Sequence, residues 1–503
     1  MDSKENKYDR QIRIWGEHGQ LLLETSRVCL LQGNAMGAEI LKNLILPGIG
    51  SYVIVDDGFV TKKEAETTFF LDVNRISETK AQQMCEFLQE LNKDVKGEYL
   101  ISTLESILEH NPNFFKQFNI VITSALNDKL LLKLEKILWG LKIPLIIAYS
   151  VGFIGYIRIT MPEHTIIETH ADNLEDLRID CPWPELKALA SNFKLENPEN
   201  HSIQIPYILI LLNCIDIWKI KSPKTLPYTY EEKEQFKQII RSYMHEFDEE
   251  KIQEVLSVAW KASCVTSIPD DVQCILRDNK CIHISSESSE FWILCHALSN
   301  YVLSEGNGLL PLPGILPDMK SDSEIYVKLR NTYHQKAQKD YEYVRKHVQN
   351  ILTSINQPIS KISDKKIKFF CKQSKYIKLL HYRSLELEYK YPNSELIKSS
   401  FSIPDDLITW YIALRCYNKF RNTFGKYAGS EQATLDKDIN QYIQLTKQFL
   451  SKFNCNITDF QIIACKELVK TRGNELNNII SFIGGVAAQE AIKEYIKNYL
   501  QIK

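Results

Sequence analysis

The chain has 503 residues, of which 44% are hydrophobic and 25% are charged, and its formal net charge is −2. This length predicts about three domains, and the small net charge argues against a general nucleic-acid or membrane-surface binder. The N-terminus MDSKENKYDRQ is polar, no apolar run reaches the roughly 18 residues of a membrane span, and the twelve cysteines form no C-x-x-C pair. We therefore expect no zinc site, reduced thiols, and a location in the cytoplasm and nucleus.

The first element predicted along the chain is a helical arm. Residues 1–6 are expected to form a disordered tail, and the apolar spacing in residues 7–24 predicts a helix. This helix places Arg10 and Arg13 near one another. Arginine on a helix is usually solvated, but a fixed guanidinium on such an arm could also contact a phosphate group.

A strand, a turn, a helix and a second strand follow the arm. Residues 28–31 and 52–55 have the composition of buried strands, residues 35–46 carry apolar side chains at helical spacing, and Asp56 ends the second strand. This order is the opening of a doubly wound, Rossmann-like α/β fold that binds nucleotides.

The turn between strand and helix departs from the phosphate-binding pattern G-x-G-x-x-G. Its three glycine positions hold Gln32, Asn34 and Gly37. Gly37 still permits close packing of helix on strand, whereas two side chains stand where bare backbone would meet phosphate oxygens. We expect the fold to persist without its phosphate site; an ordinary βαβ unit that never bound a nucleotide is the alternative.

The α/β pattern continues to about residue 165, after which helices dominate. The α/β part contains a predicted polar loop at 60–70, helices at 80–92 and 130–140, and strands at 120–123 and 143–149. Predicted helices of the second part include 206–219, 230–247, 249–262, 290–303, 326–353, 407–420 and 436–452. A last helix is predicted from residue 478 to residue 500. The expected domains are 7–169, a helical insertion at 170–473, and a return to the first domain at 474–503.

Several segments carry a family resemblance. YDRQIRIWG, AEILKNLILPGIGS, GFIGYIRI and FIGGVAAQEAIK resemble the adenylation domain of ubiquitin-activating (ThiF-type) enzymes. The segment LPGILPDMKSDSEIYVKLRNTYHQKAQKD resembles the regulatory subunits of heterodimeric neddylation activating enzymes. The similarity covers nearly the whole chain in order. It implies a degenerate adenylation domain with a large, mostly α-helical insertion.

The residues that hold ATP in active members of this family are largely replaced. Asp56 keeps the acid that follows the second strand, but residues 66–68 read Glu-Thr-Thr where Asn-Arg-Gln is expected. Residues 77–80 read Ser-Glu-Thr-Lys in place of Gly-Lys-Pro-Lys, and Glu78 would repel a triphosphate. Residues 125–128 displace the metal-binding aspartate by one position. The resemblance thus implies that this chain binds neither ATP nor Mg²⁺ and has no catalytic residue.

The resemblance also implies what the chain does. A catalytic partner subunit would hold ATP, Mg²⁺ and the thioester-forming cysteine, and the insertion here would be a cysteine-domain-like half without that cysteine. Arg10, at the arginine position of Y-x-R-Q, would reach the partner's ATP in trans. The heterodimer would adenylate the C-terminal glycine of a ubiquitin-like modifier, form a thioester and pass the modifier to a conjugating enzyme for cullin modification.

Other functions are considered beside this one. The equivalent subunit of the SUMO-activating enzyme would share the N-terminal motifs but should have a much shorter insertion. A bacterial-type adenylyltransferase or a dinucleotide oxidoreductase would need the glycine-rich loop that is missing here. A non-enzymatic interaction scaffold remains the alternative from another class.

Overall fold

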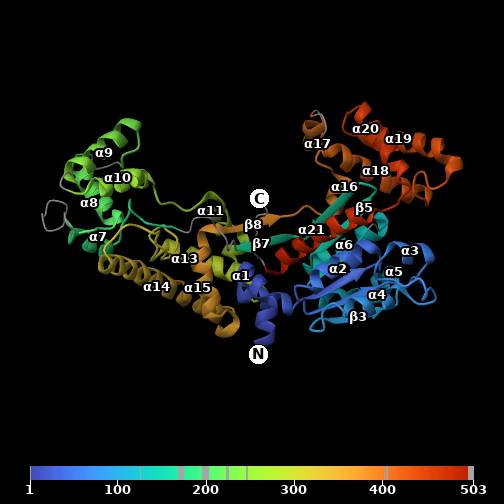
Figure 1. Cartoon of the computed structure of the whole chain (residues 1–503), viewed down its shortest axis with the longest axis horizontal. Coiled ribbons are helices and arrows are strands. Elements are labelled where there is room, and N and C mark those ends of the chain that lie inside the picture. Colours follow the sequence, from blue (N-terminus) through green and yellow to red (C-terminus); the bar gives the residue numbers. More distant parts are fainter. Residues whose placement is uncertain are drawn as a thin grey trace. The chain divides into compact units, whose positions relative to one another are not determined.

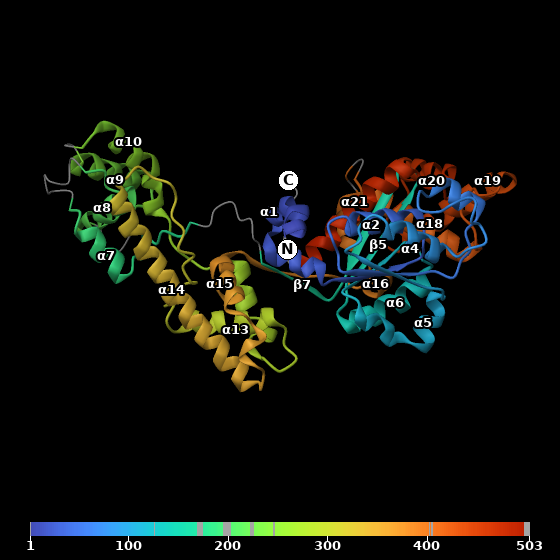
Figure 2. The same cartoon turned by 60° about the horizontal axis from the view of Figure 1, so that its bottom comes forward.

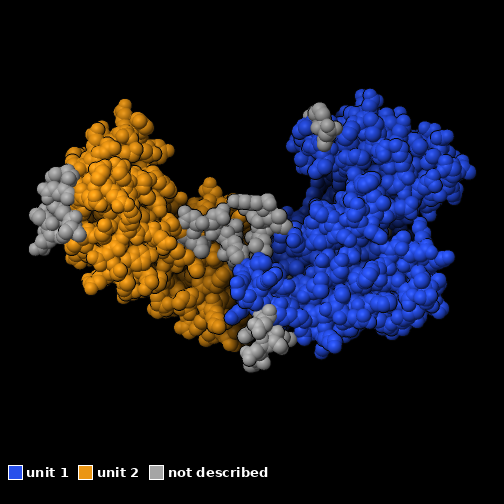
Figure 3. Space-filling model, in the orientation of Figure 1, with its two compact units in different colours: residues 1–164, 380–498 blue, residues 165–379, 499–503 orange. Residues whose placement is uncertain are grey.

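The computed structural model describes residues 2–124, 126–167, 175–194, 203–221, 226–244, 247–401, 403 and 406–496. The chain divides into two compact units (Figure 3). Unit 1 consists of residues 1–164 and 380–498, and unit 2 of residues 165–379. The predicted insertion was longer, from 170 to 473. The difference arises because the helices that follow residue 380 pack on the core of unit 1, which their amphipathic pattern alone could not reveal.

Unit 1 is built on a six-stranded sheet of order β3-β2-β1-β4-β5-β6. The strands are β1 (Arg27–Leu31), β2 (Ser51–Val55), β3 (Lys96–Leu100), β4 (Ile120–Thr123), β5 (Leu145–Val151) and β6 (Ile154–Thr160). The first five strands pair in parallel, and β6 pairs antiparallel with β5. This topology confirms the doubly wound α/β fold predicted from the opening strand–helix–strand pattern.

Alternate side chains of the central strands point to opposite faces of the sheet, and helices cover both faces (Figure 1). Val28 and Leu30 pack with α2 (Ala35–Ile45), α4 (Lys80–Gln89) and α21 (Asn477–Ile496). Cys29 and Leu31 belong to the core of the other face. Its helices are α5 (Leu104–His110), η1 (Pro112–Gln117), α6 (Asp128–Leu141), α16 (Leu385–Lys390), α17 (Ser394–Phe401), α18 (Ile408–Phe424), α19 (Leu435–Ser451) and α20 (Asp459–Lys470).

Three further elements complete unit 1. Helix α1 (Asp2–Glu24) has a break at Gly16, where φ is 73°, and it begins before the predicted start at residue 7. The polar loop predicted at 60–70 was wrong, because residues 62–67 form α3 (Lys62–Thr67). A reciprocal capping box between Thr61 and Glu64 starts that helix, and its hydrogen bonds favour helix in a polar segment. The last short element is η6 (Gln432–Thr434).

Unit 2 is helical and has two hydrophobic cores joined by one long helix, α14 (Ser323–Ser354) (Figure 2). The N-terminal half of α14 packs with α7 (Pro184–Ser191), α8 (Tyr207–Lys221), α9 (Tyr230–Tyr243), α10 (Glu249–Val258) and η3 (Ala259–Ser263). Its C-terminal half packs with α11 (Asp270–Leu276), α12 (Asn279–Ile282), α13 (Glu290–Leu303) and α15 (Asp364–Gln373). The remaining elements of unit 2 are η4 (Ile359–Lys361) and η5 (Ser374–Tyr376). A two-stranded sheet consists of β7 (Glu163–Ile167) and β8 (Ile377–His381), and each of these strands includes residues of both units. Among the described residues, no helix has the length and apolar character that crossing a membrane requires.

Candidate functional site

The candidate site is a cavity of about 640 Å³ in unit 1, at the carboxyl ends of four sheet strands. Gln32 follows β1, Asp56 follows β2, Ser124 follows β4 and Ser150 lies near the end of β5, and all four line the cavity. In open α/β sheets, ligands bind at this edge. Gln32 and Asp56, which were singled out in the sequence, therefore line one cavity at this edge, and the geometry of its side chains decides what it can hold.

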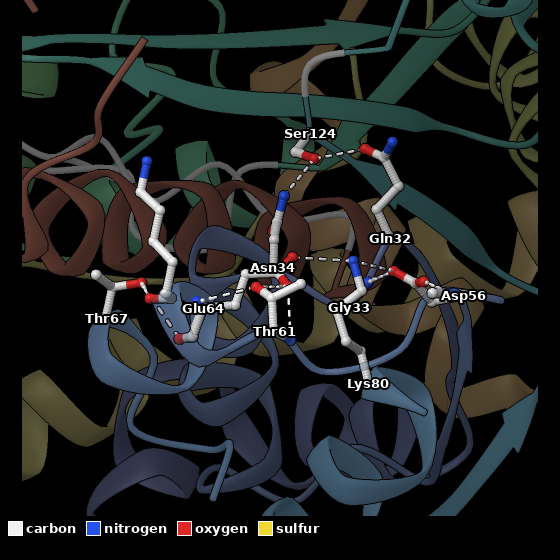
Figure 4. Close-up of polar contacts among 11 residues, drawn as sticks. Gln32, Gly33, Asn34, Asp56, Thr61, Glu64, Thr67, Lys80 and Ser124 are labelled. Carbon is white, nitrogen blue, oxygen red and sulfur yellow. Dashed lines mark hydrogen bonds and ion pairs between the residues drawn. The ribbon is translucent and has the colours of Figure 1, made fainter. Parts of the chain in front are cut away.

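The turn after β1 is filled by hydrogen-bonded side chains (Figure 4). Ser124 Oγ donates to Gln32 Oε1 at 2.7 Å, and Asn34 Nδ2 donates to Ser124 Oγ at 2.6 Å. The Oδ1 atom of Asn34 accepts the backbone N–H of Gly37 at 2.9 Å and so caps α2. Gln32 itself has a φ of 72°, a left-handed conformation that glycine adopts more easily. The turn keeps its shape because these side chains satisfy one another in place of a ligand.

Asp56 occupies the backbone donor that a phosphate would need. Its Oδ2 atom accepts the N–H of Gly33 and its Oδ1 atom accepts the N–H of Gly58, both at 2.7 Å. Lys80 Nζ lies 3.4 Å from Asp56 and 3.2 Å from Glu64. Burial alone would lower the pKa of Lys80, but the two carboxylates outweigh it and raise that pKa above its usual value. Lys80 is therefore a charged side chain held by acids of its own chain.

Glu78 lies elsewhere than the sequence suggested. Its carboxylate pairs with Arg75 at 2.5 Å, and it is not among the residues that line the cavity. Lys80, two residues later, is the residue that reaches the cavity, because Thr79 forms a β-bridge with Phe59 and then begins α4. The sequence analysis named Glu78 of residues 77–80 as the residue that would face a triphosphate, whereas Lys80 lines the cavity. Lys80 occupies the last position of the Gly-Lys-Pro-Lys pattern, which is also a lysine.

Gly37 and residues 125–128, which were also singled out in the sequence, have structural roles. A Cβ atom at Gly37 would lie 2.7 Å from the Leu30 side chain, so glycine is needed for α2 to pack on β1. Of residues 125–128, Ala125 lies outside the described residues. Asn127 caps α6 by accepting the N–H of Leu130 at 2.9 Å, and Asp128 lies 3.7 Å from Arg415.

The lining of the cavity carries more negative than positive charge. Its carboxylates are Asp56, Asp57, Glu64, Glu105 and Glu475, and its cations are Lys80 and Arg421. Burial raises the pKa of Glu475 above its usual value, although hydrogen bonds with Ser150 partly offset that effect. A triphosphate entering this cavity would meet uncompensated like charge.

Arg10 differs from its neighbour Arg13. Arg13 forms an ion pair with Asp9 at 2.8 Å within the same helix. Arg10 is exposed, and within the described part of the chain it forms no ion pair. The arm is fixed just before it, because Tyr8 is buried and its hydroxyl oxygen accepts a hydrogen bond from Asn92 Nδ2 at 3.0 Å. The Arg10 guanidinium is thus presented to solvent from an anchored helix.

The thiols show no sign of activation. Eight of the twelve cysteines are buried, and none forms a disulfide. Cys181 is exposed, and partial burial together with Asp180 raises its pKa to about 11, so the thiol stays protonated near neutral pH. Over the described ranges, no group of three or more His, Cys, Asp or Glu side chains is placed to hold a metal ion.

Comparisons with known proteins identify relatives across the whole length. The model of the ThiF family matches residues 8–501. A NEDD8-activating enzyme E1 regulatory subunit from Xenopus laevis is 38% identical over 99% of this chain and 95% of its own length. The proteins of that name from Danio rerio and, as the form AXL, from Arabidopsis thaliana are 37% and 36% identical; they cover 98% and 99% of this chain and 94% and 96% of their own lengths.

Proposed function

The chain belongs to the ThiF family and, within it, to the NEDD8-activating enzyme E1 regulatory subunits, and we propose that it is the non-catalytic half of such an enzyme. Its relatives are named regulatory subunits, which implies a heterodimer with a catalytic subunit. In this proposal the catalytic subunit holds ATP and Mg²⁺, adenylates the C-terminal glycine of the modifier and forms the thioester. A conjugating enzyme then receives the modifier for transfer to cullins, in the cytoplasm and nucleus.

The occupied phosphate turn is the observation that carries this proposal. Gln32 and Asn34 are bound through Ser124, and the N–H of Gly33 is already bound by Asp56. Opening the turn for a phosphate would break one buried and several partly buried hydrogen bonds, and a buried group left unsatisfied costs about 1–3 kcal/mol. A chain with this turn contributes to adenylation through its surface and its arm rather than through a nucleotide of its own.

Arg10 is the residue that we assign to the partner's reaction. An exposed guanidinium that forms no ion pair among the described residues can supply positive charge where a triphosphate releases pyrophosphate. The neighbouring Arg13 is engaged by Asp9 and has no such assignment.

Reconstitution with the catalytic subunit tests the proposal. We expect exchange of pyrophosphate with ATP, and thioester formation with NEDD8, only when both subunits are present. Robust exchange by this chain alone would overturn the non-catalytic assignment. Full activity of the catalytic subunit alone would reduce this chain to a scaffold, and activity with SUMO but not NEDD8 would assign it to the other pathway, which its relatives do not support.

A further inference from the structure

Four exposed lysines form a row along one side of α15 and the turn that follows it in unit 2. They are Lys365, Lys368, Lys372 and Lys375, spaced by three, four and three residues. Residues three and four apart lie on the same face of a helix, so the four ammonium groups are neighbours.

The charge of this lysine row is not compensated. Within the described ranges none of the four forms an ion pair; the polar contacts of Lys368 are Gln338 Oε1 at 3.4 Å and the Tyr341 ring at 5.9 Å. Neighbouring lysines do have acidic partners, namely Lys336 with Asp340, Lys339 with Glu185 and Lys366 with Glu290. Like charges at helical spacing destabilise a helix, and an anionic ligand would relieve that repulsion.

A groove of about 730 Å³ lies directly beside the lysine row. Its apolar lining includes Leu312, Pro313 and Ile315 from the loop between α13 and α14, and Ala337 from α14. Lys368 and Lys372 line it on the side of α15. No aspartate or glutamate is among the residues that line it. Apolar and cationic contacts are therefore offered together over one concave surface.

A second cavity of about 370 Å³ adjoins the groove, since Pro313 and Lys372 line both. Lys375 lines this second cavity, as do the exposed side chains of Trp260 and Val265. Its three acidic side chains are already engaged: Glu175 by Lys261 at 2.9 Å, Asp176 by Arg178 at 3.2 Å, and Asp180 by hydrogen bonds from Thr266 at 2.7 Å. The two cavities thus meet at Pro313 and Lys372 and together border the lysine row, whose ammonium groups form no ion pair within the described residues.

We propose that this surface binds an extended acidic peptide that carries apolar side chains. Carboxylates of the peptide pair with Lys368, Lys372 and Lys375, and its apolar side chains pack on the floor formed by the loop and α14. A nucleic acid fits less well, because a phosphate backbone gains affinity from charge and has no use for an apolar floor. The site lies wholly in unit 2 and shares no residue with the unit 1 cavity.

Fluorescence anisotropy of a labelled peptide tests this assignment with the full chain. The probe has about 12 residues in which Glu and Asp alternate with Leu and Phe, a length that spans an extended groove. We expect saturable binding that weakens as salt is raised from about 50 to about 300 mM. The triple variant Lys368→Gln, Lys372→Gln, Lys375→Gln should bind at least about tenfold more weakly, the sum of three charged contacts.

Matched controls separate a built site from diffuse attraction. The variant Lys233→Gln, Lys237→Gln, Lys320→Gln removes the same charge elsewhere in unit 2 and should bind within about twofold of wild type. A peptide with Ser in place of Leu and Phe should bind at least about tenfold more weakly, because it lacks apolar area to bury. The proposal would be overturned if the Ser peptide bound as tightly as the apolar one, or if both triple variants lost the same affinity. It would also be overturned by tighter binding of single-stranded DNA of similar length, or by no binding near 1 mM.

Discussion

Lys80 Nζ lies 3.4 Å from Oδ2 of Asp56, the acid that follows strand β2. In a dinucleotide-binding fold an acid in this region contacts a ribose hydroxyl, and an ATP-binding lysine contacts phosphate. Here the two groups neutralise one another, and Glu64 adds a second acid at 3.2 Å from Lys80. Lys80 and Asp56 are each 17% exposed or less. A phosphate entering the cavity would therefore have to displace this salt bridge as well as the side chains that fill the turn.

The first prediction is that the isolated chain does not bind ATP. Titration calorimetry at ATP concentrations up to about 1 mM should give no saturable heat, because the N–H groups of Gly33 and Gly37 are already bound and the lining is net negative. The double variant Gln32→Gly, Asn34→Gly should not restore binding, since Asp56 still holds the N–H of Gly33. Tight binding by the wild-type chain would refute this account of the cavity.

The second prediction concerns Arg10 in the heterodimer. Arg10→Ala should slow formation of the adenylate by roughly 10- to 1000-fold, the range for loss of one charge-assisted contact in a transition state. Arg10→Lys should recover only part of the rate, because an ammonium group cannot make a bidentate contact. Single-turnover adenylation at subsaturating ATP measures both.

Arg13→Ala is the control for that experiment. Arg13 lies on the same helix and loses only an exposed ion pair to Asp9, worth about 0.2–1 kcal/mol. Its adenylation rate should match that of wild type. If Arg10→Ala also matches wild type, the arm does not reach the partner's nucleotide.

The third prediction is that no cysteine of this chain carries the thioester. Cys181→Ser is the sharpest test, because Cys181 is exposed and yet has a pKa of about 11. The heterodimer with this variant should form the modifier thioester at the wild-type level on non-reducing gels. Serine variants of the other eleven should behave alike apart from stability losses at buried positions, and a folded variant without the adduct would expose a catalytic cysteine.

The fourth prediction concerns Glu475, a partly buried acid of the cavity. Burial raises the pKa of Glu475 above its usual value of 4.5, so the folded state binds this proton more tightly than the unfolded state. The stability that this protonation gives is present at pH below about 4.5 and is lost as pH rises through the folded pKa. Glu475→Gln should therefore raise the Tm at pH 7–8, by roughly 1–3 °C, and leave it unchanged near pH 4.

Glu105→Gln serves as the matched control for Glu475→Gln. Glu105 is an exposed carboxylate of the same cavity, so removing its charge should leave the pH dependence of the Tm as it is in wild type. Equal effects of the two substitutions at pH 7–8 would attribute the gain to overall charge in the cavity instead of to burial of Glu475.

Local pattern predicted more of the fold than of the site. The strand–helix–strand opening and the helices α14 and α21 were read correctly, because their apolar periodicity survives in a single sequence. The sequence did not predict that residues 380–470 belong to unit 1, because the pattern of an amphipathic helix does not reveal which core the helix packs against. Likewise, the sequence could not show that Lys80 and not Glu78 lines the cavity, because the β-bridge between Thr79 and Phe59 is a contact between separate segments.

Helix α21 closes the face of the sheet that carries Val28 and Leu30, and it comes from the last described part of the chain. All six strands of that sheet are therefore synthesised long before α21, which covers part of this face. Unit 2, whose residues 165–379 are continuous, can reach its final fold during that interval. Until α21 is made, α2 and α4 cover that face without it, so the apolar surface that α21 buries stays exposed in the nascent unit 1.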